Sequence, residues 1–151
     1  MKDGFIKVAA ASPMIKVADA EYNAGKVIEC MKKAAEKGVK LLVFPELTLT
    51  GCSCYDLIGH SVILRGAERA LEQVIQASAG SDMLVIVGLP YAPRGGALYS
   101  VAAVVSDGEL LGLVPRSETD GTLFAAADDE GGEETVCGKF DAFFDTELLF
   151  T

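Results

Sequence analysis

The sequence predicts an α/β fold with a mixed sheet, on three observations. Apolar runs of strand length alternate with two amphipathic stretches of helix length through residue 89, a pattern typical of parallel strands joined by crossover helices. Two further apolar runs joined by a short polar turn follow, which indicates an antiparallel pair. With 151 residues, 50% of them hydrophobic, the chain is long enough for one domain with a buried core.

The first half of the chain predicts a strand, a helix and a second strand. Residues 5–11 ("FIKVAAA") are expected to form a short buried strand. Asp19 is the expected N-cap of a helix over 20–37, and Gly38 is its expected stop. Residues 39–44 ("VKLLVF") then predict a strand that is apolar on both faces. The helix has apolar residues at intervals of three and four, namely Ala24, Val27, Ile28, Met31, Ala34 and Ala35.

The second part predicts another helix and three more strands. A helix over 61–79, ended by Gly80, is followed by a buried strand at 83–89 ("MLVIVGL"). After a tight "PRGG" turn, residues 98–105 and 110–114 predict a hairpin joined by "SDGE". The inward side chains expected for this helix are Val62, Leu64, Ala67, Leu71, Val74, Ile75 and Ser78.

The last third changes in character. Residues 117–134 contain seven acidic residues, three glycines and no basic residue, which predicts a mobile, solvated loop. Short strands are expected around Gly138 and Asp141. Because the sequence stops at Thr151 directly after the apolar "LLF", we expect the core to continue in residues beyond this sequence.

The overall charge excludes several classes of partner. A net charge of −9 argues against nucleic acid and anionic membrane surfaces, because both would be repelled. No run approaches the ~18 apolar residues of a membrane span, and the charged "MKDGFIKV" start leads us to expect no signal peptide. The four cysteines lack zinc-ligand spacing, so we expect no metal site, free thiols and a cytoplasmic location.

Glu46 is the ionisable side chain that its position singles out. It follows Pro45 at the predicted carboxyl end of a parallel strand, where α/β proteins build their sites. It could be a general base held against apolar walls, where desolvation raises the pKa of a carboxyl group. It could equally be a surface carboxylate that caps the next turn.

Several sequence blocks resemble the carbon–nitrogen hydrolase (nitrilase) superfamily over essentially the whole chain. The first is "FPELTLTGCSCYDL", with Cys52 where the superfamily usually has tyrosine. The second is "VIVGLPYAPRGGALYSVAAVVSDGELLGLVPR", and the last is "FDTELLF". Within the superfamily the sequence is most similar to the N-terminal glutaminase domain of bacterial glutamine-dependent NAD synthetases. Residues 1–151 would then be the N-terminal portion of a nitrilase-like αββα sandwich.

The resemblance implies an amide hydrolase with a Glu–Lys–Cys triad. The general base would be Glu46, and the lysine position falls on Arg116 in "LVPR". Arg116 could also be a surface arginine that ends a strand, and a guanidinium is not a proton donor at working pH. The aromatic residues that usually follow in the family, near the substrate entrance, are replaced by "SETDGTLFAAA".

The nucleophilic cysteine is expected after "LLF", beyond Thr151, so none of the four cysteines matches it. Cys30 is expected to pack as a small apolar side chain, and Cys137 falls in the last predicted hairpin. Cys52 or Cys54 could instead be a redox or nucleophilic thiol near Glu46, but no basic partner is evident. His60 is expected at a helix start rather than as a base.

The sequence leaves three functions open. The first is glutamine hydrolysis, to supply ammonia, as the glutaminase part of an NAD synthetase, with this chain alone inactive. ATP and deamido-NAD would be used by a synthetase domain that is not present, so no cofactor site is expected here. The second is a free-standing amidase or nitrilase. The third is a non-catalytic remnant that acts as an interaction module. Half a sandwich would expose apolar sheet surface, which favours a homo-oligomer or pairing with the missing remainder.

Overall fold

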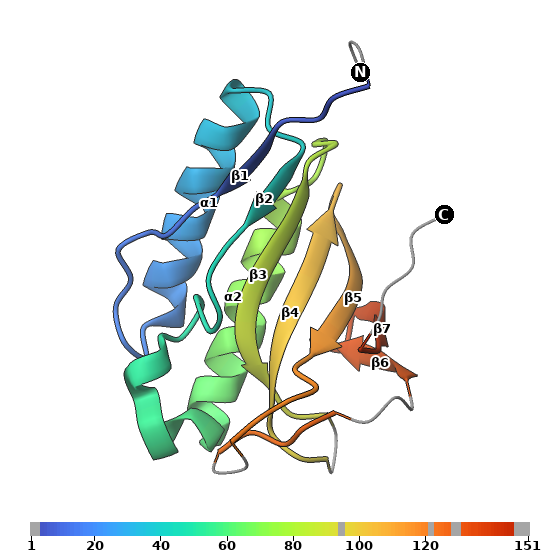
Figure 1. Cartoon of the computed structure of the whole chain (residues 1–151). Coiled ribbons are helices and arrows are strands. Elements are labelled where there is room, and N and C mark those ends of the chain that lie inside the picture. Colours follow the sequence, from blue (N-terminus) through green and yellow to red (C-terminus); the bar gives the residue numbers. More distant parts are fainter. Residues whose placement is uncertain (1–3, 94–95, 121–122, 128–130, 147–151) are drawn as a thin grey trace.

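The computed structural model describes residues 4–93, 96–120, 123–127 and 131–146 (Figure 1). Three predictions fall partly outside these residues. They are the "PRGG" turn, at residues 94–95, the 117–134 loop, at residues 121–122 and 128–130, and the end of "FDTELLF", at residues 147–150.

A mixed seven-stranded sheet forms the centre of the molecule, in the order β1-β2-β3-β4-β5-β7-β6. The first three strands are parallel, β3, β4 and β5 are antiparallel neighbours, and β7 pairs in parallel with β5. This confirms the predicted mixed sheet. The strands are β1 (Val8–Ala10), β2 (Leu41–Val43), β3 (Leu84–Tyr91), β4 (Tyr99–Ser106), β5 (Glu109–Pro115), β6 (Gly132–Val136) and β7 (Phe140–Phe144).

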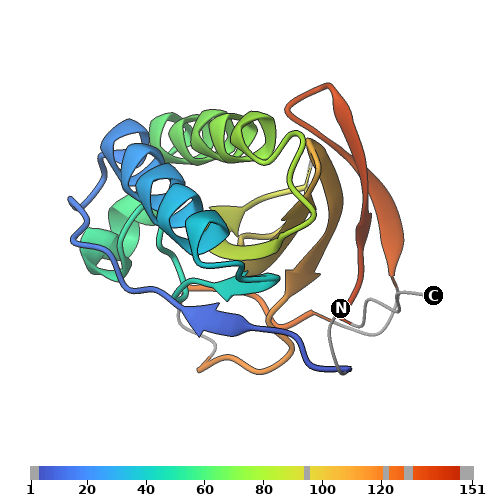
Figure 2. The ribbon, with the colours of Figure 1, turned by 90° about the horizontal axis from the view of Figure 1, so that it is seen from above.

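Two long helices lie on one face of this sheet (Figure 2). They are α1 (Ala20–Glu36) and α2 (Ser61–Ala77), preceded by the short 3₁₀ segment η1 (Cys52–Gly59). The Asp19 carboxylate accepts a hydrogen bond from the Tyr22 N–H at 3.1 Å, which confirms the predicted N-cap. Gly38 has φ of +70° beyond the end of α1, a conformation that glycine adopts without a steric penalty. The described layers are therefore one helical layer and one sheet of the predicted αββα sandwich.

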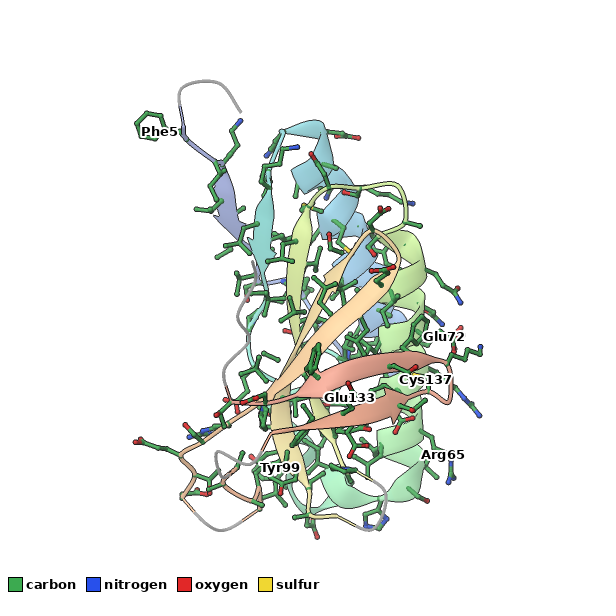
Figure 3. All side chains as sticks on the ribbon, turned by 90° about the vertical axis from the view of Figure 1, so that its right-hand side faces the viewer. Phe5, Arg65, Glu72, Tyr99, Glu133 and Cys137 are labelled. Carbon is green, nitrogen blue, oxygen red and sulfur yellow. The ribbon has the colours of Figure 1, made fainter. Side chains whose placement is uncertain are left out.

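The predicted buried strand at residues 5–11 is only partly correct. Its central residues form β1, but Val8 is 59% exposed and Phe5, before the strand, is 83% exposed; Figure 3 shows Phe5 standing clear of the ribbon. Because β1 is an edge strand and the helices cover only one face, Ala9 packs on the core while Val8 faces away. Val62, predicted to point inward from α2, is also exposed.

The segment predicted as a solvated loop at 117–134 is attached to the domain at several points. The Ala125 N–H donates to the Leu98 carbonyl at 2.8 Å, and Phe124 packs against a small apolar cluster of Leu47, Cys54 and Ile58. Residues 132–134 belong to β6. Phe124 is partly buried, and this apolar contact holds residues 123–125 against the domain.

The β6–β7 hairpin confirms the short strands expected around Gly138 and Asp141. Its turn places Cys137 at φ of +55° and Gly138 at φ of +65°, as a type I′ turn requires. No helix in the described part of the chain is both long enough and apolar enough to cross a membrane.

Candidate functional site

Glu46 lies in a tight turn that leaves the sheet and returns to it. The Phe44 N–H donates to the Ile86 carbonyl at 2.9 Å, and the Leu49 N–H donates to the Gly88 carbonyl at 3.1 Å. Between these two bonds Pro45 has no N–H to offer β3, so the chain bulges outward there. The Thr48 hydroxyl closes the turn by donating to the Pro45 carbonyl at 2.6 Å.

Gly88 allows this turn to lie directly against β3. A Cβ atom at this position would stand 2.6 Å from the Leu47 nitrogen, 2.7 Å from the Pro45 oxygen and 2.9 Å from the Glu46 Cα. Cβ atoms essentially never make contacts that short. Because residue 88 has no side chain, the backbone on both sides of Glu46 can lie directly against β3.

The Glu46 carboxylate meets two side chains that are distant in sequence. The Ser100 hydroxyl donates to Glu46 Oε1 at 2.6 Å, and Arg116 Nη1 lies 3.4 Å from the same oxygen. Ser100 is 3% exposed, whereas about half of each charged side chain is exposed. The described residues thus place Glu46 and Arg116 together, with the Glu46 side chain half exposed at the edge of the sheet.

These side chains line a cavity of about 440 Å³. Its lining residues Ile86 and Ala102 alternate along their strands with Val87 and Ala103 of the core, so the cavity lies on the other face of the sheet. The ends of β2 and β5, the middle of β3 and the first half of β4 contribute most of its wall. That volume is in the range of small-molecule sites. Glu46, Ser100 and Arg116 are joined in the cavity wall by Val43, Phe44, Pro45, Ile86, Gly88, Val101, Ala102, Val114, Pro115, Ser117 and Thr146.

None of the four cysteines lines this cavity. Cys54 is buried, and its Sγ donates to the Thr50 carbonyl at 3.2 Å, while Cys52 is exposed. The Cys137 Sγ donates to the Glu68 carbonyl of α2, and burial raises the pKa of this thiol to about 11. Cys30 packs against the core. The described residues therefore give no support to Cys52 or Cys54 as a thiol that acts with Glu46.

The other cavities of the described surface are not lined by Glu46 or Arg116. A larger cavity of about 740 Å³ lies between α1 and α2 and is lined by Arg65 and Arg69 opposite Asp19 and Glu21. In the part of the chain that is described, no three His, Cys, Asp or Glu side chains could hold a metal ion. His60 is at the N-cap position of α2 and makes no side-chain capping bond.

Sequence reasoning missed Ser100 and Gly88, although each left a signal. Ser100 is a polar residue inside an otherwise apolar strand, and its hydroxyl needs a partner when it is buried. Gly88 is a glycine in the middle of a buried strand, which often marks the close approach of another backbone. Which segment would approach could not be read from the sequence, because it depends on strand order.

Comparison with known proteins identifies the family of this chain. The profile of the family described as carbon–nitrogen hydrolase matches residues 7–136. A glutamine-dependent NAD(+) synthetase of Mycobacterium tuberculosis is 33% identical over 97% of this chain. One from Aquifex aeolicus is 36% identical over 66% of it. The chain spans only about a fifth of the length of these relatives (22% and 17%).

Solved structures show the same fold. A glutamine-dependent NAD(+) synthetase from Cytophaga hutchinsonii superposes with a TM-score of 0.81 at 21% identity, covering 92% of this chain and 25% of that one. An amidase from Nesterenkonia sp. gives a TM-score of 0.67 at 17% identity, covering 90% of this chain and 53% of that one. The match over residues 7–136, together with this shared fold, shows that the chain belongs to the carbon–nitrogen hydrolase family.

Proposed function

We propose that this chain is part of a glutamine-hydrolysing domain that supplies ammonia within a glutamine-dependent NAD synthetase. The observation that carries the proposal is the meeting of Glu46 and Arg116, 70 residues apart in sequence, at 3.4 Å in the wall of a cavity. The sequence identity with NAD synthetases over 97% of the chain supports the choice of glutamine as the amide. Residues 1–151 would form the N-terminal portion of that domain.

In this proposal Glu46 is the general base for a cysteine thiol. The carboxylate takes the thiol proton while sulfur attacks the side-chain amide carbon of glutamine, and a tetrahedral oxyanion forms. Glu46 then gives the proton to the amide nitrogen, the C–N bond breaks, and ammonia leaves. Water, deprotonated by Glu46, next attacks the thioester, so that glutamate and the free thiol are released.

Arg116 would stabilise the oxyanion as a fixed positive charge. A guanidinium keeps its charge at all working pH values and offers several N–H donors, so the electrostatic part of the lysine role is retained. Its Nη1 lies beside Glu46, which places the charge next to the group that takes up the proton. A lysine could also donate a proton, and Arg116 could not.

The 151-residue polypeptide is expected to release no measurable ammonia from glutamine. By the family resemblance the nucleophilic cysteine would lie beyond residue 151, and none of the four cysteines lines the Glu46 cavity. The measurement is a coupled ammonia assay with glutamine, run beside Glu46→Gln. Hydrolysis that Glu46→Gln abolishes would overturn the expected inactivity and would support Glu46 as the base.

The role of Glu46 itself is tested in a chimera. This chain replaces the matching 22% of the Mycobacterium tuberculosis synthetase, whose remaining sequence would supply the nucleophile. Glutamine-dependent ammonia release is expected, with a loss of about 10²–10⁴-fold on Glu46→Gln. Arg116→Lys is expected to retain or raise the rate. An unchanged rate in Glu46→Gln would contradict the proposed function.

ATP and deamido-NAD would act in a synthetase domain outside these 151 residues, so no cofactor-binding residue is assigned here. The sequence holds no stretch that resembles an ATP pyrophosphatase loop.

A free-standing amidase is the second candidate, favoured by the fold shared with the Nesterenkonia amidase. Assaying the chimera with glutamine and with butyramide, the ligand of one solved form of that amidase, separates the two functions.

Self-association is also proposed, because large apolar side chains are exposed around β1. Light scattering at micromolar concentration is expected to give a mass above that of one chain. Val8→Glu should lower that mass, since it places a charge in the apolar region, whereas Val62→Glu on α2 should not. A clean monomer for the unaltered chain would contradict this proposal. The exposed side chains are Phe5, Ile6, Val8, Met14 and Val17.

A further inference from the structure

We propose that Ser100 is the positioning residue of the Glu46–Arg116 pair, an inference that rests on the proposed function of Glu46 as a base. Ser100 lies near the start of β4, opposite Pro90 of β3 and next to Val101, which pairs with Pro115 of β5. It is 3% exposed and lines the cavity. Its place between two neighbouring strands lets it contact both members of the pair.

The Ser100 hydroxyl fixes one oxygen of the carboxylate. An ionised carboxylate has no hydrogen to donate, so the 2.6 Å bond to Glu46 Oε1 must run from the serine hydroxyl. That length is typical of a charge-assisted O–H···O⁻ bond. The donor is held in place, because Ser100 pairs with Pro90 of β3 on one side and its carbonyl accepts the Arg116 N–H on the other.

The backbone of the same residue holds Arg116. The Arg116 N–H donates to the Ser100 carbonyl at 2.9 Å, just beyond the end of β5. One residue therefore binds the base through its side chain and the adjacent cation through its main chain. The Arg116 carbonyl in turn accepts a hydrogen bond from the Ala127 N–H at 3.1 Å. This bond connects the 117–134 segment to the Glu46–Arg116 pair.

This arrangement assigns different tasks to the two carboxylate oxygens. Ser100 and Arg116 both approach Oε1, so Oε1 is the oxygen that is held. Among the described contacts none is made to Oε2, which leaves that oxygen to take the proton. Without the hydroxyl, the Glu46 side chain would rotate more freely and Oε2 would no longer be aimed in one direction.

The test uses the 151-residue chain and carbon-13 NMR of the Glu46 carboxyl group. Ser100→Ala is expected to shift the Glu46 resonance and the Arg116 side-chain resonances. Ser100→Thr should restore them, because it keeps the hydroxyl and its extra methyl can enter the cavity. Ser106→Ala is the matched control, since it removes a hydroxyl from the other end of β4 that contacts Met83 instead. A Glu46 resonance unchanged in Ser100→Ala would overturn the inference.

Kinetics in the chimera separates the failure of this inference from the failure of the proposed function. Ser100→Ala is expected to lower kcat about 10- to 100-fold with KM nearly unchanged, and Ser100→Thr should recover most of it. Full activity in Ser100→Ala, with activity abolished in Glu46→Gln, would reject the positioning role and keep the proposed function. Full activity in Glu46→Gln would reject the proposed function itself, whatever the NMR result.

Discussion

Replacing Gly88 with alanine is expected to lower the free energy of unfolding by about 1–3 kcal/mol, the usual cost of overpacking. The added Cβ would stand within 3 Å of three backbone atoms of the Pro45–Leu47 turn. Backbone atoms cannot turn aside as the tip of a side chain can, so the turn or β3 must shift. Because Glu46 is at the centre of the turn, its contacts with Ser100 and Arg116 should weaken too.

Urea denaturation and the NMR resonances of Glu46 measure both consequences of Gly88→Ala. Gly25→Ala is a matched control, because Gly25 lies within α1 and a Cβ there would meet nothing within 4 Å. That change should stabilise the protein by about 0.5–1 kcal/mol, the difference in helix propensity. Wild-type stability and unshifted Glu46 resonances in Gly88→Ala would contradict the close-packing argument.

Asn23→Ala should have the larger effect on stability, about 3 kcal/mol. Asn23 is fully buried on α1, and its amide nitrogen donates to the Lys16 and Leu49 carbonyls at 2.8 and 3.1 Å. Its oxygen accepts from the Lys16 N–H at 2.8 Å. Alanine removes the side-chain partner of all three backbone groups; the buried Leu49 carbonyl alone costs about 1–3 kcal/mol when orphaned, and the two partly buried Lys16 groups add to this.

The Asn23 substitution should also reach the candidate site. Leu49 is joined to Asn23 through its carbonyl and to Gly88 through its N–H, so it links α1 to the turn that contains Glu46. Thermal unfolding followed by circular dichroism gives the stability change. Lys32→Ala, at an exposed position of the same helix, should stay within about 0.5 kcal/mol. A similarly small change for Asn23→Ala would show that these bonds contribute little.

Much of the fold could be predicted because its pattern is local. The apolar spacing of α1, its Asp19 cap and the Gly38 stop all operate within a few residues. Asn23 could have been noticed as well, since a polar residue between Ala20 and Val27 interrupts the apolar face of this helix. What the pattern could not reveal was its partners, because Lys16 and Leu49 reach Asn23 only through the tertiary fold.

Burial was less predictable than secondary structure. The run at residues 5–11 is as apolar as the central strands, yet Val8 is exposed because β1 is an edge strand. The 117–134 segment is rich in acidic residues, yet its residues 124–127 are attached to the domain. Phe124 packs on an apolar cluster, and the Ala125 and Ala127 N–H groups donate to the Leu98 and Arg116 carbonyls. In both cases the outcome depends on which other elements are adjacent, and composition within a window does not contain that information.

The sequence by itself determined the α/β class, the carbon–nitrogen hydrolase family and the two charged candidates, Glu46 and Arg116. Each depends on residues that are close in sequence or on a block that can be recognised directly. Only the tertiary structure decided that Arg116 and Ser100 both contact Oε1 of Glu46. It also decided that Gly88 makes room for the turn that contains Glu46. The physical reason is strand order: pairing β3 with β2 and β4, and β4 with β5, brings residues 46, 88, 100 and 116 to one place.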